Sequence, residues 1–172
     1  MSRDPSPAFR RLDQTTKDDW EIIASELQHS QREVPDRVLK MLAALEHDYG
    51  GFPVDRLEHS LQCATRAERD GRDDEYVVCA LLHDIGDTLA PYNHPAVAAA
   101  ILRPVISRAN LWMLEHHGIF QGYYYWQHLG MDPTRRERYR ESPYFEPTAE
   151  FCAKYDQVAF DPDYRSEPMR AR

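Results

Sequence analysis

Leu81-Leu82-His83-Asp84-Ile85-Gly86-Asp87 places an adjacent imidazole and carboxylate directly behind an apolar run. The preceding residues, from Tyr76 to Leu82, are typical of a buried helix, so we expect His83 and Asp84 to reach the core, with Gly86 ending the helix. A buried charged carboxylate costs several kcal/mol unless it is paired or bound to a metal. The stretch therefore indicates a metal site, and a hydrogen-bonded core His-Asp pair is the alternative.

The patterning along the rest of the chain is helical. Strand alternation, internal repeats and a glycine-rich phosphate loop do not occur, so the sequence predicts an all-α fold. Residues 1–16 predict a flexible arm, and residues 17–172 predict a single helical domain. The expected helices begin at Lys17, with Thr16 as cap, and cover about 35–48, 54–70, 94–103 with Asn93 as cap, 107–117 and 148–160.

Composition limits the possible partners. The 172-residue chain has a formal net charge of -8, which disfavours nucleic acids and anionic membranes because both attract basic surfaces. We expect a cytoplasmic protein, since no apolar run reaches the roughly 20 residues that cross a bilayer and the first residues lack the apolar core of a secretion signal. Cys63, Cys79 and Cys152 are widely spaced, and we expect buried, reduced thiols without a role.

Further histidines and one acid accompany the central pair. His59 lies on the expected helix 54–70, His94 heads an alanine-rich helix, His117 follows the stripe of Leu111 and Leu114, and Asp156 sits among apolar residues. Imidazole and carboxylate together suit iron, manganese, zinc or nickel, while the absence of paired cysteines disfavours structural zinc and iron-sulfur clusters. Six ligands are too many for one tetrahedral ion. They predict two ions with Asp84 between them and open positions for water, dioxygen or substrate.

The ordered set His59, His83-Asp84 and Asp156 resembles the signature of the HD-domain superfamily, which consists mostly of metal-dependent phosphohydrolases with a helical core. With His94 and His117 added, the set resembles the two-metal members. The chain is more similar still to the mixed-valence diiron oxygenases, namely myo-inositol oxygenase and the bacterial enzymes that cleave hydroxyphosphonates. The segment Leu57-Glu58-His59-Ser60-Leu61-Gln62-Cys63-Ala64 is nearly identical to the phosphonate oxygenase motif.

This resemblance implies an HD-domain bundle with a dinuclear site in its core and an Fe(II)/Fe(III) pair. It implies an oxygenase that uses O2 to cleave or oxidise a C–H, C–C or C–P bond beside a hydroxyl in a small polar substrate, such as a hydroxyphosphonate or a quaternary-ammonium compound. It also implies that Tyr49 binds iron in the resting state and leaves when substrate arrives. The alternative is an HD phosphohydrolase of phosphoesters or nucleotides, for which manganese would serve. The substrate, the bond cleaved, the ligands of each metal and the oligomeric state stay open.

Three positions depart from the relatives. Asp87 stands where a basic residue is frequent, Gln121 stands where the phosphonate enzyme has a lysine, and Phe52 replaces an acid of the aminophosphonate enzyme. With the tyrosines of 123–125, these changes predict a pocket that tolerates a cation held by aromatic faces, although any single aromatic residue could instead belong to the core. The residues expected to bind substrate or to gate the pocket are Tyr49, Phe52, Gln62, Asp87, Gln121 and Tyr125.

Overall fold

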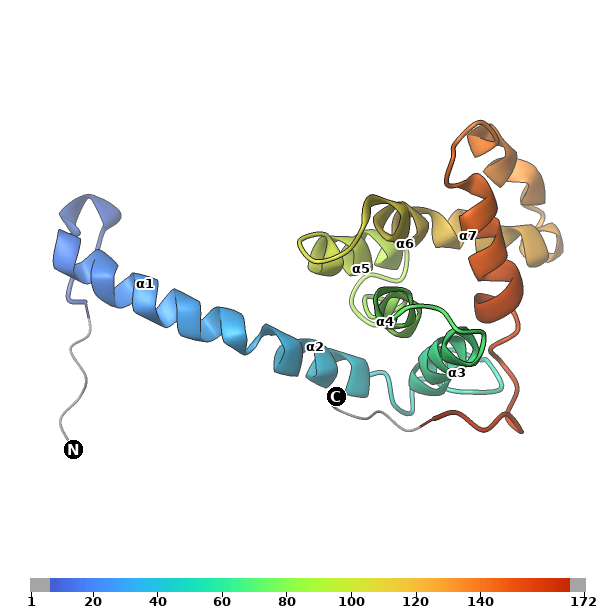
Figure 1. The fold of residues 1–172 in the computed structure, drawn as a ribbon, viewed down its shortest axis with the longest axis horizontal. Coiled ribbons are helices and arrows are strands. Elements are labelled where there is room, and N and C mark those ends of the chain that lie inside the picture. The colour runs from blue at the N-terminus through green and yellow to red at the C-terminus, as the bar shows by residue number, and fades with distance from the viewer. Residues whose placement is uncertain (1–6, 168–172) are drawn as a thin grey trace. The chain divides into compact units, whose positions relative to one another are not determined.

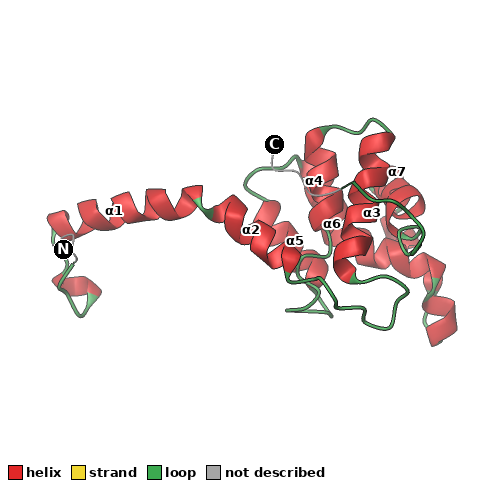
Figure 2. Ribbon diagram, turned by 90° about the horizontal axis from the view of Figure 1, so that it is seen from below, coloured by secondary structure: helices red, strands yellow, loops and turns green. Residues whose placement is uncertain are grey.

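The computed structural model describes residues 7–167, and this part of the chain is helical and contains no strand (Figure 2). The all-α prediction is confirmed. The chain divides after Met41 into two compact units. The elements are, in order, η1 (Leu12–Gln14), α1 (Lys17–Arg32), α2 (Val34–Ala43), α3 (Arg56–Arg69), α4 (Asp74–Leu82), α5 (His94–Leu102), α6 (Arg108–Gln121), η2 (Gly122–Tyr124), η3 (Trp126–Leu129), η4 (Pro133–Tyr139), α7 (Phe145–Phe151) and η5 (Cys152–Asp156).

The first unit contains α1 and most of α2. α1 begins at the predicted cap, where Thr16 accepts a hydrogen bond from the Asp19 amide and the Asp19 carboxylate accepts one from the Thr16 amide. No side chain of α1 is buried. Of the predicted arm, residues 1–6 lie outside the described part, and the short helix η1 lies within the remainder. The sequence predicted that the main domain begins at Lys17, whereas the compact unit that carries the histidines begins at Leu42.

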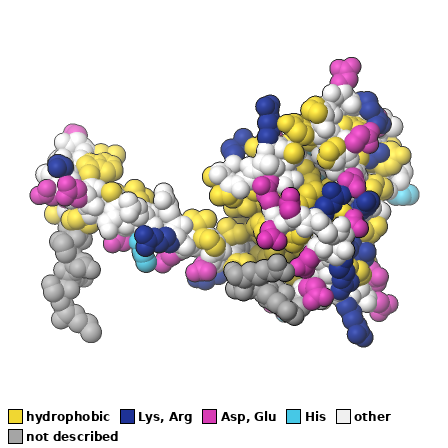
Figure 3. Space-filling view, viewed as in Figure 1, with side chains coloured by type: hydrophobic (Ala, Val, Ile, Leu, Met, Phe, Trp, Pro, Cys, Tyr) yellow, Lys and Arg dark blue, Asp and Glu magenta, His cyan; other side chains and the backbone are white. Residues whose placement is uncertain are grey.

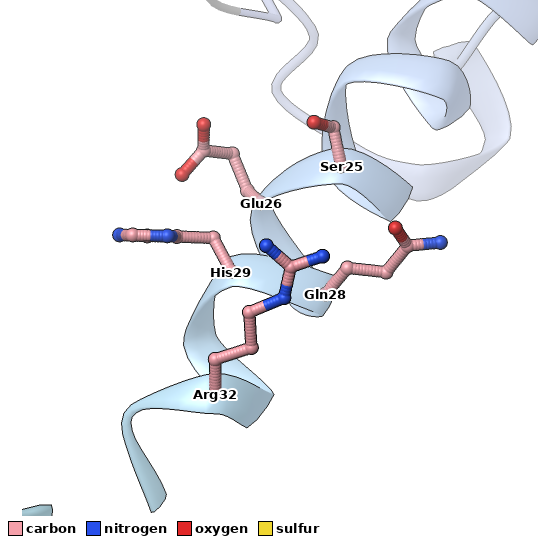
Figure 4. A pocket seen from close by; sticks show the side chains of 5 residues that line it. All are labelled: Ser25, Glu26, Gln28, His29 and Arg32. Atoms are coloured by element: carbon pink, nitrogen blue, oxygen red, sulfur yellow. The ribbon is translucent and has the colours of Figure 1, made fainter.

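A hollow of about 400 Å³ lies along α1 (Figure 4). All of its lining side chains come from about two turns of this one exposed helix: Ser25, Glu26, Gln28, His29 and Arg32. Figure 4 shows these side chains pointing outward from the ribbon. The hollow is therefore a gap between surface side chains, and we assign no site to it.

The core of the second unit is formed where α3 packs on α4, α6 packs on α5 and α7, and η5 packs on α3 and α6 (Figure 1). Each large apolar side chain fully buried there stabilises the fold by about 1.5–3 kcal/mol. The largest of them are Leu42, Leu45, Ile85, Leu114, Phe120, Phe145, Phe151 and Tyr155. Helices from both halves of this unit thus pack together around the histidines.

Polar caps begin the helices that carry the candidate ligands. The carboxylates of Asp55 and Asp73 accept hydrogen bonds from amides in the first turns of α3 and α4, and the Ser107 hydroxyl does the same for α6. Asn93 precedes α5 as predicted, but its side chain makes no capping bond. The second expected helix is shorter than predicted, because α2 ends at Ala43 and the chain then turns through a left-handed residue, His47, with φ of 67°.

The helix before the His-Asp pair also ends earlier than predicted. α4 stops at Leu82, and residues 83–89 form a series of turns. Gly86 is not the end of the helix but a point of close approach, since a Cβ there would lie 2.5 Å from the Val97 side chain of α5. Because Asp84 lies outside the helix, His83 and Asp84 are not held to the 100° separation of helical neighbours.

The last predicted helix, 148–160, is replaced by α7 and the π-helical turn η5. Such turns add a residue to the helical repeat and occur frequently at functional sites. Here the turn carries Asp156, whose side chain is completely buried. The three cysteines are buried free thiols, as predicted.

The visible surface of the second unit mixes acidic and basic side chains among apolar ones (Figure 3). Among residues 7–167, no helix has the length and apolar character needed to cross a membrane.

Candidate metal centre

Four histidines from four different segments meet in two pairs inside the second unit. The Nε2 atoms of His59 on α3 and His83 after α4 lie 3.2 Å apart, and so do those of His94 on α5 and His117 on α6. His59, His83 and His117 are buried, and the side chain of His94 is 19% exposed. Two imidazole nitrogens at this distance need a proton or a cation between them.

The opposite nitrogen of each ring faces a backbone carbonyl oxygen. Nδ1 of His59 lies 3.0 Å from the oxygen of Ala159, and Nδ1 of His94 lies 3.2 Å from that of Pro91. His83 and His117 each have a carbonyl oxygen of their own helix at 2.8 Å, from Ala80 and Leu114. A carbonyl oxygen only accepts, so Nδ1 carries the proton and Nε2 presents a lone pair in the neutral ring. This arrangement is typical of histidines that bind metals.

Asp84 lies between the two pairs and turns one carboxylate oxygen toward each. Oδ2 is 3.5 Å from Nε2 of His59 and 3.4 Å from Nε2 of His83. Oδ1 is 3.1 Å from Nε2 of His94 and 3.2 Å from Nε2 of His117. A carboxylate oriented in this way could bridge two cations, one at each pair.

Asp156 adds a second carboxylate on the side of His59 and His83. Its Oδ1 lies 3.4 Å from Nε2 of His59 and 3.7 Å from Nε2 of His83, and it accepts a hydrogen bond from the Gln121 amide at 2.6 Å. Its other oxygen, Oδ2, is buried and has no hydrogen-bond partner. A buried carboxylate oxygen without a donor is costly, and a cation would satisfy it.

The electrostatics of the cluster follow from its burial and its opposite charges. Burial alone would lower the pKa of His83, but the neighbouring carboxylates of Asp84 and Asp156 outweigh it and raise that pKa to about 9. Burial would raise the carboxyl pKa of Asp84 and of Asp156, and the surrounding histidines instead hold both below the usual range. Both acids are therefore ionised at neutral pH and attract positive charge.

The six residues fit a metal centre by donor type, orientation and burial. Ligand atoms of His59, His83 and Asp156, and likewise of His83, Asp84 and His117, lie within 4.8 Å of one another. Imidazole and carboxylate donors suit iron, manganese or zinc. One set of donors is His59, His83, Asp156 and Oδ2 of Asp84, and the other is His94, His117 and Oδ1 of Asp84. These two sets could hold two ions.

A cavity of about 270 Å³ opens onto this cluster. Three of the six candidate ligands line it: His59, Asp84 and His94. Its other walls are Phe52, Val54, Asp55, Arg56, Asp87, Pro91, Gln121, Tyr125 and Phe160. The cavity therefore has a metal-binding floor and a partly aromatic wall, and its volume suits a small molecule.

The structure places four of the six expected substrate or gate residues, Phe52, Asp87, Gln121 and Tyr125, on the cavity wall. Tyr49 is not among the lining residues, and its side chain is half exposed. Gln62 is not among the lining residues either, and its buried amide donates to the Asp161 carbonyl oxygen at 2.7 Å and accepts from the Asp161 amide at 3.3 Å. Gln62 thus fastens the C-terminal segment to α3.

Asp87 lies on the cavity wall in contact with Arg56 and His94. Its Oδ2 contacts Nη1 of Arg56, and its Oδ1 lies 3.2 Å from Nδ1 of His94. A basic residue therefore does lie on this part of the cavity wall, but it comes from position 56 and not from position 87. Gln121 likewise donates to Asp156, so its amide is already engaged beside the candidate metal site.

Sequence reasoning did not find Arg56 or Phe160. The Phe160 ring stacks on that of His59, with centroids 4.4 Å apart, and on that of Phe52 at 5.0 Å. Arg56 is the first residue of α3, three positions before His59. This closeness in sequence to a candidate ligand could have indicated that Arg56 lies near the site. No comparable local signal marks Phe160, because its place depends on how the last segment returns to α3.

Comparisons with known proteins agree with this geometry. The family model described as HD domain matches residues 56–144, just over half of the chain. A [1-hydroxy-2-(trimethylamino)ethyl]phosphonate dioxygenase (glycine-betaine-forming) from Leisingera caerulea is 54% identical over 41 residues, which cover 24% of this chain and 21% of that relative. The matched stretch is thus about a fifth of the relative's length. Since the family match covers more than half of the chain and includes five of the six candidate ligands, the chain belongs to the HD domain family.

Proposed function

We propose that the protein is an HD-domain oxygenase with an Fe(II)/Fe(III) pair that oxidises a small hydroxylated substrate with O2. The observation that carries the proposal is the position of Asp84, whose two oxygens face two separate histidine pairs at 3.1–3.5 Å. HD domain proteins are typically enzymes, and this cluster provides donors for two ions rather than one.

The donors divide unequally between the proposed ions. His59, His83, Asp156 and Oδ2 of Asp84 would hold the first, and His94, His117 and Oδ1 of Asp84 would hold the second. Three protein donors leave more open positions on the second ion. His94 and Asp84 line the cavity, so those positions face the substrate space.

The iron pair would supply O2 chemistry and Lewis acidity when bound. The protein's own residues would hold the metals, orient the substrate and form the cavity wall. Asp84 and the histidines would hold the metals to which the substrate's hydroxyl oxygen would bind, and the ring stack of Phe52, Phe160 and His59 forms one wall of the cavity. In a hydroxyphosphonate, the C–P bond would break, O2 would be reduced, and the hydroxyl carbon would become a carboxylate while phosphorus leaves as phosphate.

We propose a cationic group at the far end of the substrate. Phe52, Tyr125 and Phe160 line the cavity, and quaternary ammonium groups bind to aromatic side chains. Among the charged wall residues outside the metal cluster, Asp55 and Asp87 outnumber Arg56. The partial match to a dioxygenase for a trimethylamino hydroxyphosphonate supports this substrate class.

A phosphohydrolase would need a cation free to hold the phosphoryl group. Arg56 lines the cavity, but Asp48 and Asp87 already engage its guanidinium. The same holds for the phosphonate group of the proposed substrate, so the preference for the oxygenase over hydrolysis rests on the partial match to a dioxygenase.

The function is tested with protein purified without oxygen, loaded with iron and partly oxidised. We expect the paramagnetic signal of a coupled Fe(II)/Fe(III) pair, and O2 uptake that depends on 1-hydroxy-2-(trimethylammonio)ethylphosphonate and releases one phosphate per O2. The same assay is run with the primary amine analogue of this phosphonate and with myo-inositol. Hydrolysis of bis(p-nitrophenyl) phosphate with manganese or nickel in the absence of O2, without O2 uptake on any of the three, would contradict the oxygenase.

We further propose that Tyr49 reaches the iron in the resting enzyme by movement of its loop. Its exposed ring and the positive φ of its neighbours Gly50 and Gly51 give the loop the freedom for this movement. Resting iron-loaded protein should show a tyrosinate-to-iron absorption band in the visible region that disappears when substrate is added. Tyr49→Phe should lack the band and keep both irons, whereas Tyr92→Phe, a fully exposed tyrosine, should retain it. A band that persists in Tyr49→Phe would exclude Tyr49 as the ligand.

A further inference from the structure

Arg56 is held between two carboxylates at the start of α3. Its Nε lies 3.1 Å from Oδ2 of Asp48, and its Nη1 contacts Oδ2 of Asp87. The Arg56 side chain is 22% exposed and that of Asp87 only 8%. The guanidinium is a planar fork with fixed donor directions. These two contacts therefore orient the Asp48 and Asp87 carboxylates and also offset their negative charge.

Asp87 passes this orientation on to a candidate metal ligand. While Oδ2 contacts Arg56, Oδ1 lies 3.2 Å from Nδ1 of His94. Backbone carbonyl oxygens contact Nδ1 of the other three histidines, and His94 has both a carbonyl oxygen and this carboxylate. A carboxylate at Nδ1 fixes the ring and makes Nε2 a stronger metal ligand.

His94 is the histidine that most needs such support. It is the first residue of α5, after a loop, and its side chain is 19% exposed, compared with 4% for His59 and none for His83 and His117. Packing alone therefore restrains it least. The set of donors at His94 and His117 also has one carboxylate oxygen fewer than the other set, so the orientation of His94 matters more there.

We propose that Arg56 is a positioning residue for the second ion and acts through Asp87 on His94. This inference rests on the proposed dinuclear centre. Arg56 holds the Asp87 carboxylate in place, and that carboxylate aims Nε2 of His94 at the ion shared with His117 and Asp84. The same guanidinium also contacts Asp48, the residue before Tyr49.

The test measures binding of Mn²⁺ to the full chain by electron paramagnetic resonance of the free ion, in the wild type, Arg56→Gln, Asp87→Asn and the double variant. Each single variant should weaken one of the two ions by about 10–100-fold and leave the other within about twofold. The double variant should bind no more weakly than the weaker single one, because both changes interrupt the same connection. Anomalous diffraction from Mn²⁺-soaked crystals should show the lost occupancy at His94 and His117.

Two further variants separate positioning from general damage. Arg56→Lys keeps a charge that can reach Asp87, so it should recover part of the lost affinity. Arg136→Gln removes another part-buried arginine, which packs on the Tyr123 ring at 3.6 Å, and should leave both affinities unchanged. Metal-free melting temperatures would show whether each variant remains folded.

The outcomes distinguish this inference from the function on which it rests. Two ions bound with wild-type affinity in both single variants would overturn the role of Arg56 and leave the dinuclear centre standing. Equal weakening of both ions, or additive losses in the double variant, would overturn it as well. A wild-type protein that binds only one ion would overturn the dinuclear proposal itself and this inference with it.

Discussion

Asp84→Ala is expected to remove both metal ions and, with them, all activity. Each oxygen of this carboxylate faces a different histidine pair, so the change deletes one donor from each proposed ion at once. It also deletes the charge that offsets the cations. We expect less than 0.2 ion per chain by elemental analysis, roughly a complete loss, and activity at the metal-free background.

Asp156→Ala gives the contrast that makes this prediction specific. Of the four histidines, Asp156 lies beside His59 and His83, so its loss should leave the ion at His94 and His117 in place. Asp132→Ala serves as a matched control, since Asp132 caps η4 and should not affect either ion. Retention of two ions per chain by Asp84→Ala would contradict the bridging assignment.

Removal of the metals should lower the melting temperature strongly. Without cations, four histidine nitrogens and two carboxylates face one another in the core, and Oδ2 of Asp156 has no partner. An ion present at 100 times its dissociation constant stabilises the native state by about 2.7 kcal/mol, so two ions contribute about 5 kcal/mol. For a chain of this size, each kcal/mol shifts the melting temperature by about 2–4 °C, which gives a fall of about 10–20 °C.

This fall is measured by calorimetry before and after dialysis against a chelator, with added Mn²⁺ or Fe²⁺ restoring the original value. Asp84→Ala is the control, because a variant that binds no metal should melt at the same temperature with and without chelator. If the chelator shifts the wild type by less than about 2 °C, the ions are not part of the folded core.

Local signals predicted the beginnings of the helices and the kind of site. Thr16 shows why, since a side chain that accepts a hydrogen bond from a first-turn amide acts within three residues of itself. The apolar run before His83 likewise predicted its burial correctly, because periodicity within one helix is a local property. The HD assignment rested on residue types in a fixed order, which the sequence displays directly.

Properties that depend on distant contacts escaped prediction. The pairing of His59 with His83 and of His94 with His117 depends on how four segments pack, and spacing along the chain does not encode it. The contact between Asp87 and Arg56 was not predicted, because the two residues lie 31 positions apart in the sequence. Gln62 belongs to a motif similar to an oxygenase, yet its partner, Asp161, comes from the last segment of the chain. The close packing of Gly86 on Val97 is also a contact between distant residues.

Anomalous diffraction at the iron edge from crystals grown without oxygen tests the dinuclear centre most directly. We expect two iron peaks per chain on either side of the Asp84 carboxylate, one bound by His59, His83 and Asp156 and the other by His94 and His117. A single peak, or two peaks that do not share Asp84, would contradict the centre from which the proposed function follows.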